Sequence, residues 1–121
     1  MKLNMKYPVQ EWAPLEEQFF AYNGWTYSVT ECVEASKNEE AFDLQIRGLN
    51  IGYDSPCENS LRDFISHVAA VLNCDFKHPI ILAPNGLIID GRHRVAKAIL
   101  EGRETIKAVQ LQDWPEGEKN K

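Results

Sequence analysis

The stretch HPIILAPNGLIIDGRHRVAKAILEGRETIKAVQL, residues 78–111, decides the fold. Two apolar runs flank Asn85-Gly86, and an Asn-Gly pair in this setting is a strong signal for a β-hairpin. The second run leads directly into a helix expected over 92–101, which Gly102 ends, and a last strand is expected over 106–111. The order strand, turn, strand, helix, strand predicts an α+β domain with an internal hairpin in a small mixed sheet.

Upstream of this stretch the sequence predicts a strand and further helices, about three to four helices in all. A serine at 28 and an acid three positions later have capping-box spacing for a helix that begins there. Residues 42–51 alternate apolar and polar positions like a strand. The clearest helix covers 60–73, with Ser60 and Asp63 as its N-cap pair. Its apolar positions have the spacing of an amphipathic helix: Leu61, Phe64, Ile65, Val68 and Leu72.

Residues 1–25 are expected to form an irregular, aromatic-rich arm with one short helix over 15–22. Lysine and arginine are missing between these aromatic residues, which favours packing against the core over stacking on nucleic-acid bases. The arm could also serve as a dimer surface or a lid, and the oligomeric state stays open. The main domain is expected over 26–113 and a charged tail over 114–121. The aromatic residues expected to hold the arm are Trp12, Phe19, Phe20, Tyr22, Trp25 and Tyr27.

Length and composition suit one compact domain. The chain has 121 residues, of which 44% are hydrophobic and 26% charged. Its longest apolar runs are only a few residues, too short to span a membrane, and its N-terminus has no signal-peptide core. We therefore expect a cytoplasmic protein that does not enter the membrane.

The cysteines and two of the histidines give no metal-binding pattern. Cys32, Cys57 and Cys74 are too widely spaced for a C-x-x-C motif, and His67 and His78 stand apart from them. We expect reduced, mostly buried thiols, with Cys57 the most exposed, and no metal site.

Charge is distributed unevenly along the chain. Thirteen Lys and Arg against eighteen Asp and Glu give a net charge of −5, which argues against direct binding of the whole domain to DNA. Residues 1–60 hold ten acids and four bases, a net of −6, whereas residues 92–107 hold five bases and two acids, a net of +3. An acidic protein with one short basic segment is more typical of a small-anion binder.

The junction at residues 90–94 concentrates this positive charge. Gly91 allows a tight bend and a close approach by a ligand, and the next residues begin a helix whose first turn attracts anions. Acids normally occupy such a turn, but here Arg92, His93 and Arg94 do, and Lys97 can share a face with the last two. These cations are unfavourable there unless an anion offsets them, so the pattern predicts a phosphate or nucleotide site.

A structural interpretation of the same residues is also open. Asp90 could cap the helix, and the arginines could pair with the acids of residues 1–60. The junction has neither the Walker A nor the G-x-G-x-x-G spacing. The side of the helix expected to face the core comprises Val95, Ala98 and Ile99.

At these residues the chain resembles the ParB/sulfiredoxin superfamily, over about 26–111. The resemblance implies a small α+β domain that binds nucleotide phosphates at the start of the helix, through Gly91, Arg92, His93, Arg94 and Lys97. Sulfiredoxins carry their catalytic cysteine where this chain has Arg92, so sulfinic acid reduction is not expected. The chromosome-partitioning ParB proteins have an arginine-rich phosphate-binding box, which this chain matches at Gly91 and Arg94. They also have a helix-turn-helix domain behind the box, so centromere recognition is not expected either.

The free-serine kinases of the superfamily carry an Asp-Gly-His-His-Arg box. Asp90, Gly91, His93 and Arg94 match it, and Arg92 departs from it. By this resemblance Asp90 is the candidate catalytic residue, holding Mg²⁺ or positioning an acceptor hydroxyl. A second carboxylate would come from the N-terminal half, with Glu31 and Glu34 as candidates.

The leading expectation is a ParB-like domain that binds a nucleotide (ATP, ADP or CTP with Mg²⁺) or a phosphorylated small molecule, with turnover left open. The alternative is a kinase of a free amino acid or another small molecule, or a nucleotidase. A ParB-like nuclease or DNA-associated regulator comes third because of the net charge.

Overall fold

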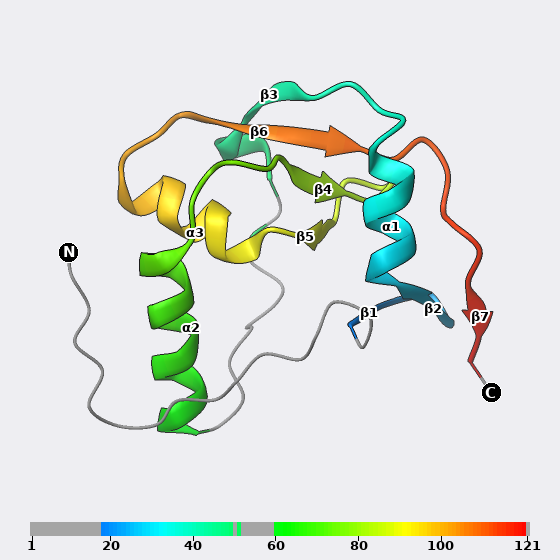
Figure 1. Cartoon of the computed structure of the whole chain (residues 1–121), viewed down its shortest axis with the longest axis horizontal. Coiled ribbons are helices and arrows are strands. Elements are labelled where there is room, and N and C mark those ends of the chain that lie inside the picture. The colour runs from blue at the N-terminus through cyan, green and yellow to red at the C-terminus, as the bar shows by residue number, and fades with distance from the viewer. Residues whose placement is uncertain (1–17, 50, 52–59, 121) are drawn as a thin grey trace.

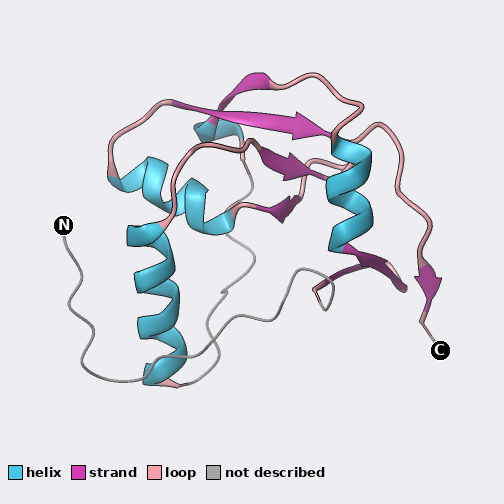
Figure 2. Cartoon of the chain, in the orientation of Figure 1, coloured by secondary structure: helices cyan, strands magenta, loops and turns pink. Residues whose placement is uncertain are grey.

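The computed structural model describes residues 18–49, 51 and 60–120. Within them the chain is a mixed α+β structure with two small sheets, as the sequence predicted at the level of fold class (Figures 1 and 2). No helix in these ranges has the length and apolar character needed to cross a membrane. The elements in chain order are β1 (Phe19–Tyr22), β2 (Trp25–Ser28), α1 (Val29–Ser36), β3 (Phe42–Gln45), the 3-10 helix η2 (Ile46–Gly48), α2 (Leu61–Asn73), β4 (Ile80–Leu82), β5 (Ile88–Asp90), α3 (Arg92–Leu100), β6 (Thr105–Gln110) and β7 (Glu118–Lys119).

The larger sheet has the strand order β3-β6-β4-β5. β4 and β5 form the expected antiparallel hairpin, and the Gly86 backbone in its turn has φ +89°, a left-handed conformation that favours glycine. β6 pairs with β4 in parallel and with β3 in antiparallel orientation, so the sheet is mixed. The hairpin leads directly into α3, which places the predicted anion-binding turn at the end of strand β5.

Apolar residues cover both faces of this sheet, which explains the unbroken apolar run in β4. Ile81 packs on one side with Cys32 of α1, whereas Ile80 and Leu82 pack on the other side with Val95 of α3. Figure 1 accordingly shows α1 at one end of the molecule and α2 and α3 at the other. Val95 and Ala98 are buried as predicted, but Ile99 is exposed, so its assignment to the core-facing side was wrong.

The N-terminal part of the described chain is a hairpin, not a helix. The short helix predicted over 15–22 is wrong at Phe19–Tyr22, which is strand β1, and residues 15–17 lie outside the described residues. Asn23 and Gly24 both have positive φ, 51° and 83°, as a two-residue turn between twisted strands requires. β1, β2 and β7 form the second sheet, so strand β7 from the expected tail pairs with β2.

The aromatic residues of this hairpin gather around Trp114. The ring of Tyr27 stacks on Trp114 at 4.6 Å between centroids, and the rings of Tyr22 and Phe20 stack at 5.4 and 5.9 Å. Phe20 and Tyr27 are buried, which confirms the predicted packing against the core for these two residues. Phe19, Tyr22 and Trp25 are exposed, and Trp12 lies outside the described residues.

Two predicted elements differ from the structure in detail. The strand expected over 42–51 ends at Gln45, because the chain turns there into η2 and buries Ile46. Helix α1 begins after Ser28 as expected, although the Ser28 hydroxyl makes no capping hydrogen bond. At α2 the predicted cap is confirmed, since the Ser60 hydroxyl accepts a hydrogen bond from the backbone N–H of Asp63 at 3.0 Å.

Helix α2 presents its faces in an unexpected orientation. Leu61 and Phe64 are 73% and 54% exposed, whereas Asp63 and Ser66 are 5% and 2% exposed. Two polar side chains of α2 are therefore buried, and most of the predicted apolar side is exposed. The exposed apolar residues of α2 are Leu61, Phe64, Ile65 and Val68.

Candidate functional site

The site begins at Gly91, which joins β5 to α3 with φ 110° and ψ 16°. A side chain here would be strained by this left-handed backbone, and its Cβ would lie 2.5 Å from Cγ2 of Ile80. The first turn of α3 contains no acid, and its N-cap residue, Gly91, has no side chain that could cap it. The turn thus combines the positive end of a helix dipole with a glycine whose missing side chain makes room for Ile80.

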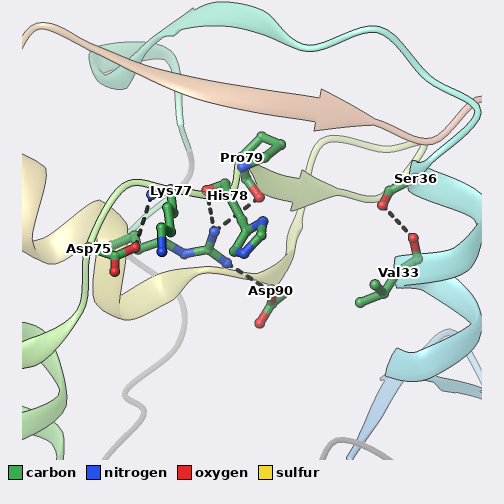
Figure 3. Close-up of polar contacts among 8 residues, drawn as sticks. Val33, Ser36, Asp75, Lys77, His78, Pro79 and Asp90 are labelled. Carbon is green, nitrogen blue, oxygen red and sulfur yellow. Dashed lines mark hydrogen bonds and ion pairs between the residues drawn. The ribbon is translucent and has the colours of Figure 1, made fainter.

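Arg94 bonds to the elements that flank the turn. Its Nη2 donates to Oδ2 of Asp90 at 2.9 Å, and its Nη1 donates to the backbone carbonyl of Pro79 at 3.1 Å and to that of His78. Figure 3 shows His78, Pro79 and Asp90, with these hydrogen bonds drawn as dashed lines. The predicted pairing of arginine with the acids of residues 1–60 does not describe Arg94, whose carboxylate partner is Asp90.

Lys97 points toward the end of helix α2. Its Nζ donates to the backbone carbonyl of Cys74 and lies 5.8 Å from the ring centre of Phe76. The Arg103 guanidinium lies over the same ring at 4.1 Å. Lys97 and Arg94 therefore both donate to backbone carbonyls of residues 74–79, the segment that leads into β4.

His93 meets a residue that the sequence left isolated. Its Nε2 lies 2.7 Å from Nδ1 of His67 on α2, and the two ring centres are 5.0 Å apart. The Nε2 of His67 is in turn 3.6 Å from Oδ1 of Asp63, one helical turn earlier on α2. The interpretation of His67 as too isolated to join a site was therefore wrong.

Burial lowers the pKa of His93 below the usual histidine value. The neighbouring His67 acts in the same direction, Asp90 opposes the shift, and Arg92 adds to it. His93 is thus mainly neutral near pH 7 and contributes a polar ring more than a positive charge to the turn.

The remaining predicted residues lie at the edge of the turn. Arg92 is half-buried at the first position of α3, and the Asp90 side chain, at the end of β5, is 38% exposed. The two acids proposed from the N-terminal half belong to α1, which packs on the other core cluster. Of these, Glu34 is engaged with Lys37 at 2.8 Å, and Glu31 lies in the first turn of α1.

The thiols agree with the expectation of reduced cysteines. Cys32 is fully buried, and this burial, reinforced by Glu31, raises the pKa of its thiol to about 11. Cys74 is partly buried, and Cys57 lies outside the described residues. Within the part of the chain that the structure describes, no three His, Cys, Asp or Glu side chains gather in a way that could hold a metal ion.

Sequence reasoning missed Asp63 and His67 as site residues. Asp63 was expected only as part of a helix cap, and no spacing along the chain connects His67 with His93, 26 positions later. The signal that could have found them was the pair itself: an acid and a histidine four positions apart on a helix, with both side chains on one face.

In comparisons with protein-family models, curated proteins and solved structures, no match to this chain was found. The fold and the turn together define an α+β protein with a glycine turn at a helix N-terminus. The ParB/sulfiredoxin resemblance stays a prediction.

Proposed function

We propose that the protein binds a nucleotide or a phosphorylated small molecule through its phosphate group at the Asp90–Arg94 turn. The observation that carries this proposal is the left-handed Gly91 at the N-terminus of α3, followed by Arg92 and His93 where helices normally place acids. A phosphate here would interact with the positive end of the helix dipole and with a cation on the same turn.

The hydrogen bonds of the turn divide its cations into two groups. Arg94 and Lys97 donate to backbone carbonyls of residues 74–79, so they hold the turn in place and add positive potential from behind it. A bound phosphate would lie against the backbone of the turn, where Arg92 at the first position of α3 adds positive charge. Of the five predicted binding residues, Gly91, Arg92 and His93 are the ones at the start of α3, so they would lie closest to such a ligand.

Magnesium would enter this site with the nucleotide. Mg²⁺ is commonly held by one or two carboxylates together with phosphate oxygens and waters. Asp90 is the carboxylate at the turn, and its Oδ2 already accepts from Arg94. The residues thus suit a metal carried by the phosphates, with Asp90 as one protein ligand.

A thermal-shift panel tests the proposal. Inorganic phosphate, ATP, ADP and CTP are each added with and without Mg²⁺, which separates a phosphate preference from a nucleotide preference. A ligand at 100 times its Kd stabilises the native state by about 2.7 kcal/mol. Arg92→Gln should weaken the shift, whereas Lys107→Gln, which removes one exposed charge from β6, should not. Absence of a shift with every ligand would refute the proposal.

A further inference from the structure

Helix α2 presents a row of apolar side chains at the surface of the molecule. Successive members of this row are four, three and four residues apart, the spacing by which two α-helices pack along a common seam. Its first and third members, Leu61 and Val68, are 73% and 41% exposed, and Phe64 beside them is 54% exposed. A continuous exposed apolar surface of this kind is typical of an interaction site. The members of this α2 row are Leu61, Ile65, Val68 and Leu72.

The side of α2 opposite this row is the buried one. Asp63 and Ser66 are 5% and 2% exposed, and a helical turn of 3.6 residues places them across the helix from the α2 row. The contact of His67 with His93 joins α2 to α3 without using any member of the row. The α2 row is therefore accessible to a second molecule.

We propose that the α2 row binds the same row of a second copy of the chain, with the two α2 helices antiparallel about a two-fold axis. The seam spacing favours a helix as the partner, and two-fold symmetry lets one surface serve both protomers. The axis passes midway between Ile65 and Val68, so Ile65 of one protomer faces Val68 of its partner. The proposal does not depend on the phosphate site, which lies at the start of α3.

The charges of α2 favour the antiparallel arrangement. Arg62 is the exposed charged residue of the helix, because Asp63 is buried. In an antiparallel pair each Arg62 lies beside the C-terminal, negative end of the other α2 helix, which the exposed acid Asp75 follows. A parallel pair would instead bring the two Arg62 side chains together. No acid belongs to the α2 row, so the net charge of −5 opposes association only at a distance, where salt screens it.

The size of this surface sets the strength of the pair. A helix of 13 residues is about 20 Å long, so two such helices alone bury less than the roughly 800 Å² per partner of a typical stable interface. Leu100 extends the apolar surface, since it is 75% exposed and lies one turn beyond Lys97, which bonds to the Cys74 carbonyl at the end of α2. We expect a weak dimer with a Kd of about 10–100 μM. The chain is then monomeric at the low micromolar concentrations of an unfolding experiment.

Sedimentation equilibrium of the full chain without nucleotide, from about 1 μM to about 1 mM, tests the proposal. The average molar mass should rise with concentration from that of one chain toward that of two, and more readily at higher salt. Val68→Glu should raise the Kd about tenfold or more, because it places a charge in the apolar contact. Leu61→Glu repeats the test at a more exposed position, where a folding defect is not expected. Phe19→Glu makes the same kind of change at a 63% exposed position of β1, so this matched control should leave the Kd unchanged.

A pair of complementary variants tests the antiparallel arrangement. Ile65→Lys and Val68→Glu should each be monomeric alone and form a mixed dimer together, because these positions face each other across the axis. Failure of the mixture to associate would overturn that arrangement. A chain that is monomeric at every concentration, or a dimer that Val68→Glu and Leu61→Glu leave intact, would overturn the proposal. A monomer that loses thermal stability in both glutamate variants would also overturn it, and would show that another part of the same chain covers the α2 row.

Discussion

Gly91 and Ile80 approach each other so closely that a Cβ on Gly91 would lie 2.5 Å from Cγ2 and 2.8 Å from Cβ of Ile80. Ile80 is fully buried in β4, so it has no room to move aside. The contact fixes the end of β5 against β4 and with it the direction in which α3 begins. It makes the glycine a requirement of the fold.

Gly91→Ala should therefore be strongly destabilising. Backbone strain at φ 110° and the clash with Ile80 together predict a loss of about 2–5 kcal/mol in the free energy of unfolding, measured in urea. Gly86→Ala is the matched control, because Gly86 also has positive φ but its added Cβ would meet nothing within 4 Å. That variant should lose only about 1–2 kcal/mol. Equal losses would show that the Ile80 contact contributes nothing.

Arg94 is predicted to act mainly on stability. Its guanidinium donates hydrogen bonds to the carbonyls of His78 and Pro79 and to the carboxylate of Asp90. No single ammonium group can reach these three acceptors together. Arg94→Lys and Arg94→Gln should each cost about 1–3 kcal/mol of unfolding free energy without any ligand present.

The control for Arg94 is Arg47→Gln, which removes an exposed arginine from η2 and should change stability by less than about 0.5 kcal/mol. A stable Arg94→Gln variant that loses only its response to phosphate would contradict this assignment. It would place the guanidinium on the ligand instead.

Residues 78–111 were predictable because their signals are local. The Asn85-Gly86 turn, the end of α3 shortly before Gly102 and the apolar run of β4 each depend on a few neighbouring residues. The Asn23-Gly24 pair gives the same hairpin signal. Its flanking strands are short, however, and residues 1–25 were expected to be irregular, so this hairpin was not predicted. The order of strands in the two sheets depends on contacts between distant residues, which single-sequence patterns do not report.

Sequence patterns predicted the candidate site only at the start of helix α3. Spacing placed Gly91, Arg92 and His93 together, and the structure keeps them on one turn. The partners of Arg94 and Lys97 are backbone carbonyls, and a sequence pattern carries no information about them. The His67–His93 contact depends on how α2 packs against α3, and the apolar periodicity of α2 suggested the opposite face.

The outward apolar face of α2 makes a direct prediction about stability. Leu61→Ser should change the free energy of unfolding by less than about 0.5 kcal/mol, because Leu61 is already 73% exposed. Ser66→Leu should cost about 1–3 kcal/mol, since Ser66 is 2% exposed and donates its hydroxyl proton to the carbonyl of Arg62. Chemical denaturation of both variants gives the comparison. The reverse order would mean that the leucine side of α2 faces the core.

The His67–His93 contact predicts a loss of stability in mild acid. The pKa of His93 is lowered in the folded state, so the unfolded chain takes up a proton near pH 6.5 that the folded ring still resists. The unfolding free energy should therefore be unaffected by this group above about pH 6.5 and should fall as the pH drops below it, until the native ring also protonates. Protonation of both rings would also place N–H against N–H in a contact of 2.7 Å.

Thermal or urea unfolding at several values between pH 5 and 8 measures this slope. His93→Gln should remove part of the decline below pH 6.5, because the variant has no ring to protonate at that position. His78→Gln should leave the decline unchanged, since His78 is exposed and its bond to Arg94 is made by the backbone carbonyl. A decline that is identical in all three proteins would show that protonation of His93 does not oppose folding, and that other groups account for the acid sensitivity.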